Sequence, residues 1–143
     1  MNNNFLKYHP ESNTYIAEKR SYFKDEIRVD GNLIAGALSN FWKSLRVNGS
    51  VELGKRTIVR GDLQAKRILL GPGSEIHGNL HAEEEAILLD GAIVTGSATC
   101  GGQMKIRPGC KIEFAKADRE LEIVGKVQIG DIESGTRVVV RSD

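Results

Sequence analysis

The sequence predicts an all-β protein, a single-stranded, three-sided parallel β-helix, or β-solenoid. Three observations support this fold class. Apolar residues recur at every sixth position over most of the 143-residue chain. A second apolar series lies two residues before the first, and glycine and proline return at intervals of 18, which is three such units. A helical period of 3.6 residues does not fit these spacings.

Composition narrows the class of protein further. The chain has 20 Lys and Arg against 19 Asp and Glu, so its net charge is +1. This balance argues against a uniformly basic nucleic-acid binder, and no nucleic-acid partner is expected. No apolar stretch reaches the ~18 residues of a membrane span, and residues 1–10 lack the apolar core of a signal peptide. Two cysteines make no disulfide scaffold. We therefore expect a cytoplasmic, reduced protein.

The first 26 residues differ from the rest of the chain. All sixteen glycines lie at Gly31 or later, whereas five of the eight aromatic residues lie within residues 1–26. These residues carry four basic and four acidic side chains and show no clear period. We expect residues 1–26 to form a tail or a cap, residues 27–140 the β-helix, and residues 141–143 a short C-terminal tail. Residues 27–46 are expected to form the first, less regular coil.

From Val47 onward the six-residue period is clear. The first series is apolar at every position: Val47, Leu53, Val59, Ala65, Leu70, Ile76, Ala82, Leu88, Val94, Cys100, Ile106, Ile112, Ala117, Ile123 and Ile129. In the second series, from Val51 to Val127, only Thr57 and Ser74 are polar. Residues two apart lie on the same face of a strand. Each unit is therefore predicted to be a short strand with two inward side chains, followed by a turn.

Turn residues predict how the strands are wound. Gly73, Gly91 and Gly109 are 18 apart, as are Gly78 and Gly96, so the chain returns to the same corner after every third unit. Two five-residue steps predict coils of 17 residues among those of 18. Phe114 stands where the Gly78 series predicts glycine, and we expect a local difference there. About six coils at ~4.8 Å each give a rod near 30 Å long. Right-handed crossovers are the default for parallel β structure.

The repeats resemble those of bactofilins, the polymer-forming cytoskeletal proteins of bacteria. The similarity lies in Arg60-Gly61-Asp62-Leu63-Gln64-Ala65, Ile68-Leu69-Leu70-Gly71-Pro72-Gly73 and Ile76-His77-Gly78-Asn79-Leu80-His81-Ala82, and extends over roughly residues 27–140. The resemblance implies a right-handed β-helix that polymerises end to end without nucleotide and supports cell shape. It also implies partners in the copies of the same chain and, beyond them, the inner membrane surface or cell-wall-related proteins.

Few residues suggest catalytic or metal chemistry, and no cofactor or metal is expected. His77 and His81 are predicted to point outward, with Thr95 and Thr99 at the matching positions one coil later, which supplies no third metal ligand. Cys100 and Cys110 fall on inward series. Gly71-Pro72-Gly73 lacks the Lys and Ser or Thr of a phosphate loop. The protein is expected not to be an enzyme, the alternative being a hexapeptide-repeat acyltransferase-like or solenoidal carbonic-anhydrase-like enzyme.

Charge is distributed unevenly along the chain. Residues 43–67 carry a net charge of +5, and residues 68–104 carry −5 without any Lys or Arg. This pattern predicts either ion pairs between neighbouring coils or a basic surface that attracts anionic lipid or cell-wall polymer. The predicted basic surface comprises Lys43, Arg46, Lys55, Arg56, Arg60, Lys66 and Arg67.

The ends of a solenoid expose unpaired backbone groups, which are templates for another chain. We therefore predict a self-assembling structural protein whose terminal coils carry the joint. The predicted interface residues are Val138, Val139 and Val140 at the C-terminal end and Phe41 and Trp42 in the first predicted coil.

Overall fold

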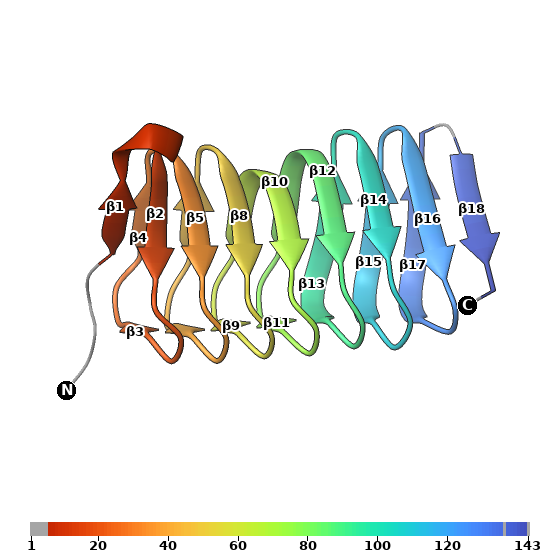
Figure 1. The fold of residues 1–143 in the computed structure, drawn as a ribbon. Helices are drawn as coiled ribbons and strands as arrows, with labels where there is room; N and C mark the ends of the chain where they lie inside the picture. Colours follow the sequence, from red (N-terminus) through yellow and green to blue (C-terminus); the bar gives the residue numbers. More distant parts are fainter. Residues whose placement is uncertain (1–5, 136, 143) are drawn as a thin grey trace.

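The fold is one continuous sheet wound into a coil, as seen in a computed structural model that describes residues 6–135 and 137–142 (Figure 1). Eighteen strands make up this sheet. The one helical segment among the described residues is a 3-10 turn, η1 (Pro10–Ser12). No helix in that part of the chain is long and apolar enough to cross a membrane.

Three walls run along the rod, named here from their place in Figure 1. The front wall holds β2 (Thr14–Ala17), β5 (Asn32–Ala35), β8 (Ser50–Leu53), the second halves of β10 (Leu63–Leu70) and β12 (Leu80–Leu88), β14 (Gln103–Ile106), β16 (Glu120–Val124) and β18 (Arg137–Arg141). The lower wall holds β3 (Tyr22–Phe23), β6 (Asn40–Phe41), β9 (Ile58–Val59), β11 (Glu75–Ile76) and the first parts of β13 (Ile93–Cys100), β15 (Lys111–Ala117) and β17 (Gln128–Ser134). The rear wall holds β4 (Ile27–Val29), β7 (Leu45–Val47) and the remaining halves of the long strands.

Neighbouring coils pair in parallel along every wall. Leu63 lies in register with Leu45 before it and with Leu80 after it, and the same spacing of 17 or 18 residues holds on the other walls. The front strands run downward, the chain returns upward behind them and it advances from left to right, so the coil is right-handed (Figure 1). The predicted parallel β-helix is confirmed.

The solenoid has about seven turns, not six, because it begins earlier than predicted. Residues 14–17 pair in parallel with β5, and residues 22 and 23 pair with β6, so much of the predicted tail forms a full coil. Ahead of this coil, β1 (Lys7–His9) runs antiparallel to β2 and covers its outer edge. Residues 1–26 therefore supply both a coil and a cap, apart from residues 1–5, which lie outside the described part.

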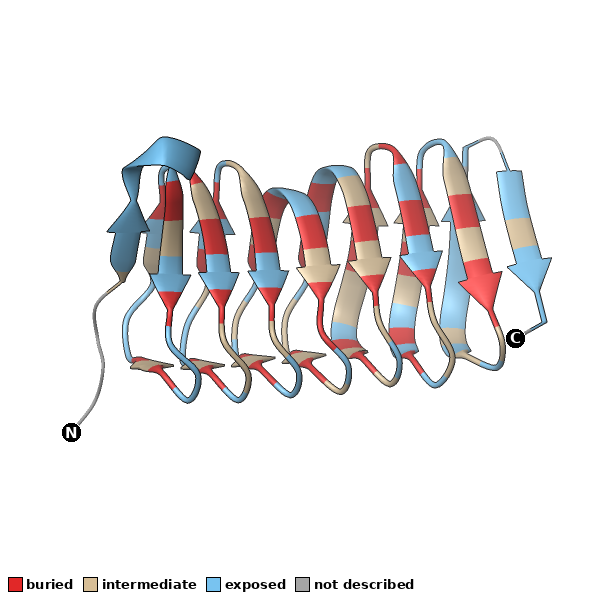
Figure 2. Cartoon of the chain, in the orientation of Figure 1, coloured by how far each residue is buried: buried red, intermediate tan, exposed pale blue. Residues whose placement is uncertain are grey.

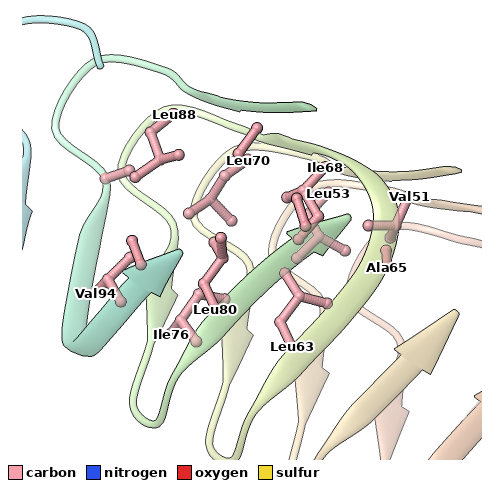
Figure 3. Close-up of a cluster of buried hydrophobic side chains, with 14 of the residues drawn as sticks. Val51, Leu53, Leu63, Ala65, Ile68, Leu70, Ile76, Leu80, Leu88 and Val94 are labelled. Atoms are coloured by element: carbon pink, nitrogen blue, oxygen red, sulfur yellow. The ribbon is translucent and has the colours of Figure 1, made fainter. Parts of the chain in front are cut away.

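The core is a single column of apolar side chains along the axis of the rod (Figure 3). Nearly every member of the two predicted series is buried; Val127 and Ile129 in the last full coil are only half-buried. Buried and exposed residues alternate along each strand, which gives the banded pattern of Figure 2. The first two coils also hold stacked Phe23 and Phe41, whose ring centroids are 5.0 Å apart, so the interior admits aromatic side chains there.

The polar members of the second series are buried and hydrogen bonded. The Ser74 hydroxyl accepts a bond from the Thr57 amide at 3.1 Å and donates to the Gly54 carbonyl at 3.0 Å. The Thr57 hydroxyl donates to the Gly36 carbonyl. Ser21 and Ser39 occupy the same inward position in the first two coils, where Ala92 and Cys110 stand later. Small side chains at this corner thus satisfy turn carbonyls inside the core.

Phe114 marks a shorter coil. Val94 pairs with Ile112 eighteen residues later, but Ser97 pairs with Phe114 only seventeen later. The register therefore shifts between these pairs, and the glycine position of the earlier coils is missing rather than replaced. The local difference predicted at Phe114 is present.

Candidate functional site

The C-terminal end of the solenoid exposes part of its apolar interior. Among the described residues β18 pairs with β16 on one edge only. Val138 and Val140 are 46% and 69% exposed, and Ile132 is 43% exposed. A cavity of about 630 Å³ opens at this end and is lined in part by Cys110, Val127 and Val140.

The three predicted valines do not share one orientation. Val138 and Val140 lie in register with Leu121 and Ile123, whose side chains are buried, and so continue the inward columns. Val139 lies in register with Glu122, on the outer surface of the front wall. Two of the three valines therefore belong to the end face, and the third belongs to its rim.

The N-terminal prediction needs correction, because Phe41 and Trp42 do not lie on an end face. Phe41 is 1% exposed and is covered by Phe23 of the preceding coil. Trp42 is 47% exposed but lies on the side of the rod. Its ring meets the edge of Tyr22 at 6.0 Å, and the Arg60 guanidinium carbon lies 4.6 Å from its centroid. At the actual N-terminal end, β1 covers β2, while β3 and β4 pair on one side only.

The predicted basic residues lie on different sides of the rod. Lys55 and Arg56 lie at the edge between the front and lower walls, Lys43 and Arg60 between the lower and rear walls, Arg46 on the rear wall, and Lys66 and Arg67 between the rear and front walls. They form a band around coils two to four rather than one patch.

Part of this band is paired with neighbouring coils. Arg46 contacts Glu26 at 3.0 Å and donates to Gln64, and Arg67 contacts Glu84 at 2.8 Å. The predicted ion pairing between the Arg67 region and the acidic residues of the next coil is confirmed at this pair. Similar pairs join Glu120 to Arg137 and Glu122 to Arg141 on the front wall. Exposed pairs of this kind contribute only ~0–1 kcal/mol each.

Both histidines of the repeat region face outward, as predicted. His77 lies 3.1 Å from Glu75, and His81 lies 2.7 Å from the Thr99 hydroxyl, its predicted neighbour one coil later. No group of three potential metal ligands occurs in the described part of the chain. Gly71-Pro72-Gly73 forms the turn between β10 and β11, with Gly73 at φ +69°.

The two cysteines are buried thiols in different walls. Burial is the main cause that raises the pKa of Cys100 and of Cys110 above the ordinary value of 9.0. The Cys100 Sγ donates to the Gln103 carbonyl at 3.1 Å, and the Cys110 Sγ donates to the Leu89 carbonyl at 3.2 Å. Thiols held in the neutral form are poor nucleophiles.

The sequence analysis missed one functional feature at the front-lower edge. Gly73, Gly91 and Gly109 adopt left-handed φ there, and so do Arg20, Leu38 and Arg56 in the first three coils, with φ of 61°, 62° and 54°. Each of the six donates its N–H to the carbonyl of a residue 16 to 17 positions later, from Arg20 to Ala37 through Gly109 to Lys126. Stepping the glycine spacing back by 17 and 18 from Gly73 would have found these residues.

Comparisons with known proteins give a limited result. No protein-family model matches the chain. The bifunctional protein GlmU of Xylella fastidiosa strain M12 is 33% identical over 63 residues, which is 44% of this chain and 12% of that protein. The GlmU protein of strain 9a5c matches to the same extent. The chain therefore spans 12% of the length of these curated relatives. No solved structure matches.

Proposed function

We propose that this protein is a structural subunit that assembles end to end into filaments without nucleotide, as a cytoplasmic scaffold for cell shape or for partner proteins. The observation that carries the proposal is the C-terminal end face. There an open strand edge borders the exposed side chains of Val138 and Val140. An exposed edge next to apolar surface is a template for another sheet.

A nucleotide has no evident role in such assembly. The glycine-rich segment at residues 71–73 forms a solenoid corner followed by the two-residue strand β11, not by a helix. Phosphate loops use the N-terminus of a following helix to bind the anion. Stacking itself supplies the free energy, because each joint buries apolar side chains and pairs backbone groups.

The direct test is negative-stain electron microscopy of the purified protein, together with sedimentation, in buffer without ATP or GTP. We expect filaments or sheets whose amount rises with protein concentration and is unchanged by added nucleotide. Monodisperse monomers over a wide range of concentration and salt would contradict the proposal.

A hexapeptide-repeat acyltransferase-like or carbonic-anhydrase-like enzyme is the second candidate. The partial match to the bifunctional protein GlmU is the observation that favours it. His77 and His81 are the available imidazoles on the coils, and their contacts are Glu75 and Thr99. Turnover of acetyl-CoA or hydration of CO2 that His81→Ala abolishes would support this candidate over the structural one.

A further inference from the structure

A basic and apolar face covers the lower wall of the first three coils. We define the lower face as residues 18–25, 36–43 and 54–61, which comprise β3, β6, β9 and the two edges beside them. These segments hold seven Lys and Arg against Glu18 and Asp25, a net charge of +5 in a chain whose total is +1. The seven cations are exposed: Lys19, Arg20, Lys24, Lys43, Lys55, Arg56 and Arg60.

The charge stops abruptly along the rod. In coils four and five the matching segments are residues 71–78 and 89–96, which contain no Lys or Arg. They contain Glu75 and Asp90 instead. The lower face is thus confined to the N-terminal part of the solenoid, at the lower left in Figure 1.

Apolar side chains lie among these cations. Leu38 is 40% exposed and projects from the edge between Arg20 and Arg56, one coil from each. Trp42 is 47% exposed at the opposite edge, and Tyr22 and Ile58 are half-buried between the two edges. Amphipathic Trp and Tyr rings with Lys and Arg beside them are typical of residues at a membrane–water interface.

The backbone at the front-lower edge gives an independent argument. Later coils place glycine at the left-handed position, where an L side chain is strained. The first three coils instead place Arg20, Leu38 and Arg56 there, at φ of 54° to 62°. The strain has no compensating ion pair or packing contact for these side chains in the described structure, since all three are exposed. Strained residues of this kind are often retained for a function.

We propose that the lower face binds the surface of an anionic phospholipid bilayer, with the cations at the headgroups and Leu38 and Trp42 at the acyl boundary. A nucleic acid is the less favoured occupant. Arg60 covers one face of the Trp42 ring and Tyr22 meets its edge, so the ring is not an open platform for stacking bases. The face lies on the side of the rod, and binding there leaves both ends of the solenoid free. This proposal therefore does not depend on the proposed filament.

The test is flotation of the full chain with vesicles of phosphatidylcholine containing 30% phosphatidylglycerol, compared with pure phosphatidylcholine. Filaments alone stay at the bottom of the gradient, so assembly and lipid binding are scored separately. We expect flotation with the anionic vesicles only, and a blue shift in the emission of Trp42, the single tryptophan of the chain.

The decisive variant is Arg20→Gly with Leu38→Gly and Arg56→Gly. It introduces the residue that coils four to six already carry at this corner, so the fold is expected to remain, as circular dichroism would check. We expect at least a tenfold weaker affinity for anionic vesicles. The matched control, Arg28→Gln with Lys116→Gln on the rear wall, also removes two cations and should stay within twofold of wild type.

Three results would overturn the proposal. The wild type might fail to float with anionic vesicles, or the triple glycine variant might float as well as wild type. Binding of an oligothymidylate without binding of vesicles would assign the lower face to nucleic acid instead.

Discussion

At the scale of single residues, the interior positions of this solenoid select for size more than for chemistry. The inward corner position is Ser74 in one coil, Ala92 in the next and Cys110 after that, and all three are fully buried. Cys100 likewise stands between Ala82 and Ala117 in register. Both cysteines thus replace alanine-sized neighbours and are structural residues.

The buried thiols give a prediction about reactivity and pH. Because burial raises the pKa of both cysteines, the folded protein should react with Ellman's reagent at pH 8 at least about 100-fold more slowly than the unfolded chain. Their raised pKa stabilises the fold below the unfolded value near 8.5, and this contribution is lost as pH rises, since the unfolded thiols ionise first. Stability should therefore fall from about pH 8.5 upward.

Denaturant unfolding at pH 7 and pH 10 measures this loss. The matched control is Cys100→Ala with Cys110→Ala, which copies the neighbouring coils and should lose less stability between the two pH values than wild type. An identical pH dependence in both proteins would assign the effect to other groups.

At the scale of the repeated element, the corners determine where each strand begins. At one corner, Asn79 Oδ1 accepts the Ser97 amide of the next coil at 2.9 Å, and Asp62 Oδ1 accepts the Asn79 amide at 2.8 Å. Gly78 and Gly96 lie directly beneath these side chains. A polar side chain and a glycine from successive coils therefore form one unit of the corner.

Two glycine substitutions separate crowding from backbone strain. In Gly96→Ala the new methyl group would meet Asn79 Oδ1 and lie 2.7 Å from the Gly78 carbonyl oxygen, which should cost about 2–4 kcal/mol by overpacking and loss of the corner bond. In Gly91→Ala the nearest atom is 3.9 Å away, so only the left-handed φ of +75° is unfavourable, at about 1–2 kcal/mol. Urea unfolding of both variants measures the difference, and equal losses would show that crowding at Gly96 relaxes freely.

The same corners explain how far sequence predicted the fold. From Val47 onward, narrow walls require small or apolar inward residues, so the two series identified nearly every buried position. The first coil escaped prediction because Arg20 and Leu38 replace the glycine that marks this corner later. Without that coil, Phe41 was placed at an end, whereas it is stacked inside on Phe23. The lower face was only partly predicted, since its cations come from all three early coils.

At the scale of the whole molecule, the two ends of the rod differ. The N-terminal end carries β1 across the edge of β2, and Leu6 and Tyr15 pack against the core there. The C-terminal end carries β18 with an open edge in the described structure, beside the exposed Val138 and Val140. The C-terminal end face is therefore the better candidate for the joint.

The orientation of the valines provides a test of that joint. Val138 and Val140 continue the inward columns above Leu121 and Ile123, so a docked coil would bury them, while Val139 lies in the outer column with Glu122. Val138→Arg or Val140→Arg would place an unpaired charge inside the joint, at a cost of several kcal/mol, or about a hundredfold or more in affinity between subunits. We expect short, soluble species that keep a β-rich circular dichroism spectrum. Val139→Arg adds the same charge on the rim and should still form filaments that pellet. If the Val138 and Val140 variants pellet like wild type, the joint lies at the N-terminal end, and Tyr15→Arg becomes the variant to measure.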